Sequence, residues 1–446
     1  MKYLIKNATV VNEGEIGNYD VLIENELIAQ IDRHIENTGN YKEINAEGLH
    51  LLPGAIDDQV HFREPGLTHK GEIYTEAKAA VAGGVTSFME MPNTNPLTVT
   101  IPELENKYRR ASECSLANYS FFMGATNKNL DEILKVDYSN VCGVKIFMGS
   151  STGDMLVDDT KALEHIFSQV NALVATHCES DPMIKENQKR IIETYGEDLP
   201  AYFHPVIRNE EACYASSSFA VEMAKKFNTR LHILHISTAR ELSLFTNKVP
   251  LKEKRITAEA CVHHLWFSDD DYATKGNLIK WNPAVKTAYD RDKIFEAVLN
   301  GTIDVIATDH APHTIEEKSQ PYLKAPSGGP LVQHSVLAML DFYHSKKITL
   351  DKIVEKMSHN VADLFRVEKR GYIREGYFAD LVLVNLNKPV TVSKDNILYK
   401  CGWSPFEGHT FKSSIEKTFV NGHLVYDNGQ FDESRLGSRL SFVKQA

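Results

Sequence analysis

Ionisable side chains stand where several short apolar runs of this chain end. One run is followed by His61, and three others finish at or just before His177, His235 and Asp309. Lys145 lies inside the apolar run GVKIFMG, where an ammonium group would be costly to bury alone. Imidazole and carboxylate groups suit zinc and similar divalent ions, which lower the pKa of bound water toward neutrality. These residue types predict a metal centre that supplies a hydroxide nucleophile.

Each of these side chains also has a simpler explanation. A single histidine at a strand end is more often a hydrogen-bonded core or loop residue than a metal ligand, and a buried lysine usually pairs with a carboxylate. Asp309, which precedes His-Ala-Pro, could cap a helix. These explanations would have to hold independently at five strand ends, whereas one metal cluster accounts for all five. The metal-site interpretation is therefore favoured.

The elements that must position these residues alternate between strand and helix patterns from residue 51 to residue 370. We expect about eight strands there, in the runs LLPGAIDDQV, GVTSFMEM, NYSFFMGA, CGVKIFM, ALVATH, RLHILHI, RITAEAC and DVIATD. Strand–helix alternation predicts parallel strands with right-handed crossovers, and eight such units fit a (β/α)8 TIM-like barrel. In such a barrel the working residues lie at the C-terminal ends of the strands. A doubly wound open sheet is the alternative that spacing alone leaves open.

The two ends of the chain share a different pattern. Both contain short alternating runs, such as NATVVN near the start and EKTFVNGHLVYDNG near the end, with Asn-Gly turn signals between them. We expect residues 1–50 and 371–446 to form one small β-sandwich domain beside a catalytic domain of residues 51–370.

Composition excludes some classes of function. The formal net charge is −11 with acidic and basic residues well mixed, so no basic stripe exists to bind nucleic acid. The six cysteines form no C-x-x-C pair, which is typical of reduced thiols in the cytosol. No signal-peptide pattern opens the chain and no run of eighteen apolar residues occurs. We expect a soluble cytoplasmic protein that contacts no membrane.

The motifs resemble those of the amidohydrolase superfamily, and H-F-R-E-P-G at residues 61–66 suggests its dihydroorotase branch. The resemblance follows the family's order along nearly the whole chain, through P-G-A-I-D (53–57), MPNTNP (91–96), GVKIFMG (143–149), ATHCE (175–179), LHIST (234–238), WNP (281–283) and ATDHAPH (307–313).

The resemblance implies a role for each candidate residue of the metal centre. His61, His177, His235 and Asp309 correspond to metal ligands for one or two zinc ions. Lys145 corresponds to the lysine that reacts with carbon dioxide in many relatives, giving a carbamate that bridges two metals. A buried neutral amine is nucleophilic, and two cations would stabilise the resulting anion. Asp309 would also carry the proton from the attacking water to the departing nitrogen.

Gln59 departs from the family pattern. The first motif of the family usually reads His-x-His, and here its first position is glutamine. An amide oxygen is a weaker zinc ligand than imidazole. Two alternatives follow: a binuclear site that survives through Lys145 and Asp309, or a single metal near His177 and His235.

Arg63 carries the prediction of the substrate. In the resemblance, an arginine here holds the free carboxylate of dihydroorotate, with Asn93 and His313 beside it. A planar guanidinium can bind a carboxylate through two hydrogen bonds. Allantoinase-like relatives tend to carry asparagine at this position and dihydropyrimidinase-like relatives also lack the arginine; a surface salt bridge is the simpler explanation of Arg63. Asn282 and the backbone of residues 326–329 resemble the parts that recognise the ring's amide edges.

Other polar residues near the motifs receive smaller roles. Ser151 and Thr152 could belong to a closing lid, although a plain loop is the simpler interpretation. The resemblance makes neither His263 nor His264 a ligand, and it places His310 behind the residues that contact substrate.

The resemblance implies the reversible interconversion of N-carbamoyl-L-aspartate and L-dihydroorotate in pyrimidine biosynthesis. The alternatives are another cyclic amidase, of the allantoinase or dihydropyrimidinase type, and a catalytically inactive relative that serves as a structural partner. Replacement of only the first histidine favours an enzyme. A homo-oligomer is expected, since relatives are often dimers or larger.

Overall fold

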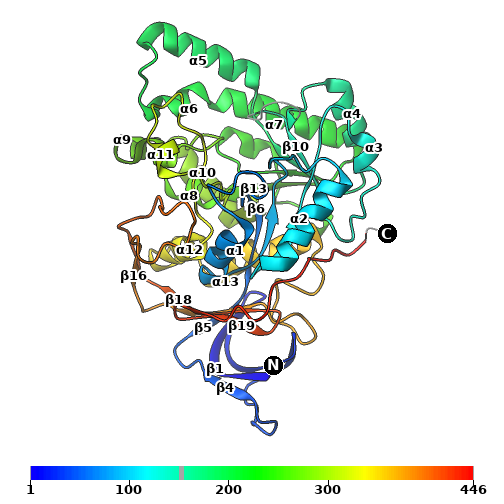
Figure 1. Cartoon of the computed structure of the whole chain (residues 1–446), viewed down its shortest axis with the longest axis vertical. Helices are drawn as coiled ribbons and strands as arrows, with labels where there is room; N and C mark the ends of the chain where they lie inside the picture. The colour runs from blue at the N-terminus through cyan, green and yellow to red at the C-terminus, as the bar shows by residue number, and fades with distance from the viewer. Residues whose placement is uncertain (1, 150–154, 445–446) are drawn as a thin grey trace.

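The computed structural model describes residues 2–149 and 155–444 of the chain (Figure 1). Ser151 and Thr152, the candidate lid residues, lie outside the described residues. Among the helices that are described, none is long and apolar enough to cross a membrane.

Both ends of the chain build one nine-stranded sheet, at the bottom of Figure 1. Its order is β20-β19-β18-β15-β5-β1-β2-β3, with β4 paired to β1. The first hairpin turns through Glu13 and Gly14, which both have positive φ, the geometry that matches the twist of a two-residue hairpin. The strands are β1 (Lys2–Asn12), β2 (Glu15–Glu24), β3 (Leu27–Asp32), β4 (Lys42–Asn45), β5 (His50–Pro53), β15 (Leu381–Asn385), β18 (Ser414–Val420), β19 (His423–Asp427) and β20 (Gln430–Phe431). A separate pair comprises β16 (Val390–Thr391) and β17 (Thr410–Phe411).

The middle of the chain supplies parallel strands in two ladders, as the alternating pattern predicts. One ladder has the order β6-β7-β8 and the other β14-β13-β12-β11-β10-β9. Their residues are buried on both faces, except Ile256 at the start of β13, and such continuous burial is typical of parallel sheets. The strands are β6 (Ala55–Val60), β7 (Val85–Glu90), β8 (Asn118–Phe121), β9 (Met123–Gly124), β10 (Val144–Phe147), β11 (Val174–His177), β12 (Leu231–Ile233), β13 (Ile256–Cys261) and β14 (Val305–Ala307).

The two ladders are connected in two ways: by the chain itself and by a β-bridge. One residue, Phe122, separates β8 from β9, so the chain passes directly from the first ladder to the second. A parallel bridge between Val60 and His310 joins the end of β6 to the segment just after β14. The parallel ladder therefore leads from β6 through β14 and back to β6.

Helices connect and cover the parallel strands (Figure 1). They begin where the sequence supplies caps: Thr100 accepts a hydrogen bond from the Glu103 backbone at the start of α2, and Asn209 accepts one from Ala212 at the start of α7. The helices are α1 (Ile73–Ala82), α2 (Ile101–Cys114), α3 (Leu130–Ile133), α4 (Thr160–Gln169), α5 (Asp181–Tyr195), α6 (His204–Ile207), α7 (Glu210–Phe227), α8 (Val262–Trp266), α9 (Tyr272–Lys275), α10 (Ala288–Asn300), α11 (Ile315–Lys318), α12 (Ser335–His344), α13 (Leu350–Val354) and α14 (Asn360–Phe365). Short 3-10 turns occupy Ala201–Phe203, Arg240–Leu244, Leu251–Glu253, Asp269–Asp271 and Gly276–Ile279, and a π turn occupies Glu355–His359.

The run LLPGAIDDQV differs from the single strand that its sequence predicts. The structure divides it at Gly54: β5 pairs antiparallel with β15 in the terminal sheet, whereas β6 pairs parallel with β7. A Cβ at Gly54 would lie 2.1 Å from the Thr86 hydroxyl oxygen, so only glycine fits at this crossing. The apolar character of both halves hides the break, because each half is buried in its own sheet.

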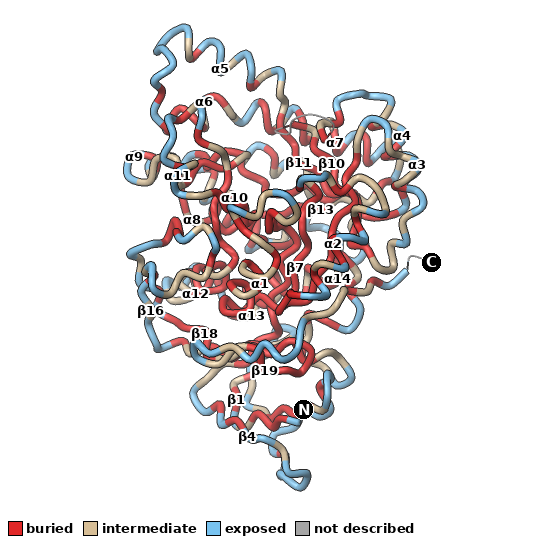
Figure 2. Tube along the Cα trace, viewed as in Figure 1, coloured by how far each residue is buried: buried red, intermediate tan, exposed pale blue. Residues whose placement is uncertain are grey.

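Buried residues occupy the middle of the molecule around the parallel strands (Figure 2). A second apolar cluster, which includes Tyr3, Val10, Leu381 and Phe419, lies in the terminal sheet. The chain end returns toward the parallel strands, where Leu440 and Phe442 pack in a cluster with Met89 and Leu234. The parallel strands and their ends, where the candidate residues stand, are therefore held between packed layers.

Candidate metal and catalytic site

Parallel strands end at a common edge, and the predicted ligands lie at or just beyond these ends. His61 directly follows β6, His177 is the last residue of β11, and His235 and Asp309 each stand two residues past β12 and β14. His235 and Asp309 have positive φ, so the backbone leaves the extended strand conformation at both residues. All predicted ligands are buried: Gln59, His61, Lys145, His177, His235 and Asp309.

His61, Gln59 and Asp309 form one contacting group. The Asp309 Oδ1 atom lies 3.1 Å from His61 Nε2 and 3.2 Å from Gln59 Nε2. Asn93 lies on the other side of the imidazole, with its Oδ1 2.8 Å from His61 Nδ1. Because Asn93 accepts the proton on Nδ1, the lone pair of Nε2 is left toward Asp309. An imidazole lone pair facing a carboxylate is an arrangement that fits a cation between them.

His177 and His235 form a second contacting group. His177 Nδ1 lies 2.9 Å from His235 Nε2, and His177 Nε2 lies 3.0 Å from a carboxylate oxygen of Glu179. Arg208 holds that carboxylate at 2.5 Å. A carboxylate behind a histidine fixes its tautomer and orients the other nitrogen toward a metal. Burial lowers the pKa of both His177 and His235, which favours the neutral imidazole that can bind a metal.

Glu179 contacts a predicted ligand, His177, although the sequence motifs did not single it out. It belongs to the quoted motif ATHCE, two positions after His177. Its contact with His177 requires the turn after β11 to fold back. The spacing of the motif was the available signal, but it did not specify which of the two residues after His177 would point inward.

Lys145 lies on β10 and is almost completely buried. Its Nζ atom stands 4.6 Å from the centre of the Phe147 ring. Burial lowers the pKa of the amine to about 8, although the charges of Asp309 and Glu259 act in the opposite direction. A substantial neutral fraction near pH 8 is the state that reacts with carbon dioxide.

Arg63 is buried and makes its hydrogen bonds to neutral partners. Its Nε donates to the Pro312 carbonyl at 3.0 Å, and its Nη2 lies 3.0 Å from His313 Nε2. Among the described residues, no carboxylate forms an ion pair with it. Burial lowers the pKa of Arg63 to about 10, so the guanidinium stays charged at neutral pH. The simpler explanation of a surface salt bridge is thus wrong, and the charge is available for an anion.

His313 is held from three sides. Lys70 Nζ lies 3.1 Å from its Nδ1 and 3.2 Å from Glu317. His313 Nε2 lies 3.0 Å from the Ser327 carbonyl. A lysine ammonium only donates, so Nδ1 accepts from Lys70, and Nε2 lies between the Arg63 guanidinium and the Ser327 carbonyl. The contact with Ser327 connects His313 to residues 326–329, the segment that the resemblance assigns to substrate recognition.

Asn282 lies beside the same region. Its Oδ1 is buried without a hydrogen-bond partner in the described part of the chain, and the preceding Trp281 donates from Nε1 to the Asp309 carbonyl at 3.3 Å. An unpaired amide oxygen at this position is available to a ligand that donates a hydrogen bond. His263 stacks on Trp281 with ring centres 4.4 Å apart, so its ring is occupied by packing.

His310 points away from the predicted ligands. Its Nε2 lies 2.8 Å from Glu76, and its Nδ1 accepts from the backbone of Leu331 at 3.0 Å. Both ring nitrogens are therefore engaged. The residue fixes the loop after β14 behind the site.

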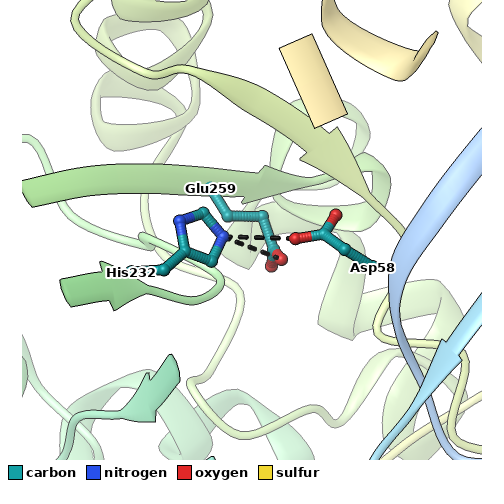
Figure 3. Close-up of side chains that lie close together, drawn as sticks. All are labelled: Asp58, His232 and Glu259. Atoms are coloured by element: carbon teal, nitrogen blue, oxygen red, sulfur yellow. Dashed lines mark ion pairs between the residues drawn. The ribbon is translucent and has the colours of Figure 1, made fainter. Parts of the chain in front are cut away.

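A further buried cluster comprises Asp58, His232 and Glu259, from β6, β12 and β13 (Figure 3). Among the described residues, it is the one group of three whose candidate ligand atoms all lie within 4.8 Å of one another. Burial opposes a charged imidazole, but the two carboxylates outweigh it and raise the pKa of His232. The sequence did not predict this cluster, because its members lie within strands that read as buried and apolar.

The comparisons with known proteins come from sequence and from structure. The model of the amidohydrolase family matches residues 50–425. A dihydroorotase of Carboxydothermus hydrogenoformans is 33% identical, over 96% of this chain and 98% of the relative. An allantoinase of Desulfitobacterium hafniense is 28% identical, over 98% of each chain. The L-hydantoinase of Arthrobacter aurescens superposes with a TM-score of 0.90 at 25% identity, over 96% of this chain and 97% of that one.

The family match spans most of the chain, and the relatives that it resembles are aligned almost from end to end. The resemblance that the motifs indicate is confirmed. Relatives with several ring substrates share the fold, so the reaction class is better determined than the ring. The chain belongs to the amidohydrolase family and is a metal-dependent cyclic amide hydrolase.

Proposed function

We propose that the protein is a dihydroorotase, which interconverts N-carbamoyl-L-aspartate and L-dihydroorotate. The observation that carries the proposal is the buried Arg63 guanidinium, which pairs with no carboxylate among the described residues. Dihydroorotate has a carboxylate outside the ring, and a guanidinium is its natural partner. A ring without that group would leave the buried charge unpaired, which is unfavourable. Asn93, His313 and Asn282 complete the proposed substrate contacts.

The residues proposed for zinc fit a metal. Asn93 and Glu179 occupy the rear nitrogens of His61 and His177, which leaves the other nitrogens for a cation. The proposed ligands are His61, His177, His235 and Asp309, with Lys145 as a carbamate and Gln59 as a weak ligand. Zinc would polarise the scissile carbonyl and acidify a bound water. One or two ions per chain are compatible with the two contacting groups.

Asp309 is the proposed proton carrier. In ring opening, the water oxygen bonds to the ring carbonyl carbon and the carbon–nitrogen bond breaks. Asp309 takes a proton from that water and delivers it to the departing ring nitrogen. In ring closure the same atoms move in reverse. Trp281, which donates to the Asp309 backbone carbonyl, helps to hold the carboxylate in place.

We also propose that the parallel strands form a (β/α)8 barrel. The return of the ladder to β6 through the Val60–His310 bridge supports closure, and an open doubly wound sheet would not have this contact. The proposed domains are residues 51–370 for the barrel and 1–50 with 371–446 for the β-sandwich domain. The nine-stranded sheet built from both ends supports two parts of this kind, with the terminal sheet extending through β5 to Pro53.

The cellular location, the oligomeric state and the partners of the protein are also proposals. All six cysteines are free thiols in the structure, which supports the proposed reducing cytoplasm. A homo-oligomer is proposed from the resemblance alone, and light scattering of the purified chain would measure its mass. The substrate is a small molecule, and nucleic acid and membrane are not proposed as partners.

Turnover of a panel of rings tests the proposal. The zinc-loaded protein is expected to open dihydroorotate and to leave allantoin and dihydrouracil nearly untouched. Arg63→Ala should lower kcat/KM for dihydroorotate about 30-fold or more, since truncating one member of a buried charge pair costs about 2–5 kcal/mol. Arg439→Ala, which removes the ion pair with Glu105 away from these residues, is the matched control.

Three results would overturn the assignment. Unchanged turnover by Arg63→Ala removes its basis, and faster opening of allantoin or dihydrouracil identifies another cyclic amidase. Metal-loaded protein that opens none of the rings would be an inactive structural relative.

A further inference from the structure

The Asp58, His232 and Glu259 cluster has the shape of a second metal site, one layer deeper than the strand ends. His232 Nε2 lies 3.2 Å from Asp58 Oδ2 and 3.7 Å from Glu259 Oε2. All three side chains are fully buried. Figure 3 shows the imidazole and both carboxylates pointing toward one another from three different strands. Ligand atoms of one divalent ion in a tetrahedral site stand about 3–3.5 Å apart, given metal–ligand distances near 2.0–2.1 Å.

The hydrogen bond at Nδ1 turns the Nε2 atom of His232 into the cluster. His232 Nδ1 lies 2.8 Å from the Thr257 hydroxyl oxygen. That hydroxyl donates its own hydrogen to the Leu231 carbonyl at 3.2 Å, so it accepts from Nδ1. The raised pKa of His232 keeps a second proton on Nε2, between the two carboxylates. A divalent ion would displace this proton and take the lone pair of Nε2. Metal-binding histidines are commonly oriented in this way by a hydrogen bond from the second nitrogen.

The carboxylates have free oxygens that face the same point. Glu259 Oε1 accepts from the His235 backbone at 2.9 Å and from the Cys261 thiol at 3.3 Å. Apart from the ion pairs with His232, Glu259 Oε2 and both oxygens of Asp58 have no hydrogen-bond partner in the described part of the chain. One imidazole shared by two buried carboxylates leaves most of their acceptor capacity unsatisfied, which is rare in native proteins. A cation on this point would satisfy the free oxygens and the imidazole together.

We propose that Asp58, His232 and Glu259 bind one divalent transition-metal ion, separate from the metal predicted at the strand ends. One imidazole with two carboxylates suits zinc, manganese or iron(II). Two carboxylates and a neutral imidazole make the bound site electrically neutral with a divalent ion. The site is coupled to the strand-end residues through Glu259, whose second oxygen holds the His235 backbone.

Anomalous X-ray scattering from crystals of the full chain, grown after loading with zinc, tests the proposal directly. Data collected on both sides of the zinc absorption edge should show a peak between the three side chains, in addition to any peak beside His177 and His235. A map with a peak beside His177 and His235 and none within the cluster would overturn the proposal. This result is separable from substrate turnover, so the two proposals can fail independently.

Metal content of variants supplies the second measurement. The Asp58→Asn variant keeps the volume of the side chain and should lose about one equivalent of zinc per chain after dialysis. The Asp57→Asn variant is the matched control, because Asp57 is equally buried on the same strand but its oxygens already accept from Thr308 and Gln59. Equal zinc content in Asp58→Asn and the native protein would contradict the proposal. Should Asp58→Asn fail to fold, His232→Gln replaces it.

Discussion

Gln59 has an amide side chain at the position where the family motif usually has a second histidine, within the metal site proposed at the strand ends. Its Nε2 donates to Asp309 Oδ1, and its Oε1 lies 3.7 Å from the Cys261 sulfur. The side chain therefore holds Asp309 by a hydrogen bond, and its oxygen is the poorer ligand for zinc. At the scale of one residue, we expect the proposed metal site to bind its ion more weakly than a site with His-x-His.

Because imidazole is a better zinc ligand than an amide oxygen, Gln59→His is expected to bind zinc about tenfold more tightly at this site. Competition with a fluorescent zinc chelator measures the change. Gln333→His serves as the control. Gln333 is half-buried, and its Nε2 donates a hydrogen bond to the Asn396 carbonyl. Equal affinity in Gln59→His and the native chain would show that residue 59 does not face the metal.

At the scale of elements, loops after the strands determine how the substrate side is assembled. Gly328 has φ of +125°, and a Cβ there would lie 2.5 Å from the Ala311 carbonyl oxygen. The same Cβ would lie 3.2 Å from the His313 ring. The loop thus approaches the segment after β14 as closely as it does only because residue 328 is glycine.

Gly328→Ala should displace this loop from His313 and raise KM for dihydroorotate, while lowering the free energy of unfolding by about 1–3 kcal/mol. Gly376→Ala is the matched control, because Gly376 also has positive φ but nothing lies within 4 Å of its added Cβ. Steady-state kinetics and urea denaturation of both variants separate loop displacement from backbone strain. A KM that changes equally in the two variants would contradict the prediction.

At the scale of the whole molecule, a buried polar network joins the terminal sheet to the parallel strands. Asp380 accepts from Arg370, from Asn118 at 3.2 Å and from the Asn421 backbone at 2.8 Å. Asn118 belongs to β8, whereas Asp380 directly precedes β15. The network orients the two parts of the fold through residues that are far apart in sequence.

Asp380→Ala should lower the free energy of unfolding by about 3–5 kcal/mol, since it leaves the buried Arg370 charge without its partner. The double variant Asp380→Ala with Arg370→Met should recover much of that loss, because it removes the charge as well. Urea denaturation of the two variants and the native chain measures both effects. A double variant no more stable than the single one would show that the charge pair is not the source.

The sequence by itself determined the family, the reaction class and the alternation of parallel strands with helices. These properties follow from local patterns, because each apolar run, the polar residues at its end and each motif span only a few neighbouring residues. It also placed His61, His177, His235 and Asp309 at strand ends, although their ligand roles stay predictions.

Tertiary structure alone decided which of these residues touch. It paired His61 with Asp309 and His177 with His235, it brought Glu179 behind His177, and it divided one apolar run between two sheets at Gly54. It also assembled Asp58, His232 and Glu259 from three strands. The physical reason is that such contacts form between segments that are distant in the chain. A polar residue within an apolar strand pattern gives no local sign of its partner, because the partner is determined by how the strands pack.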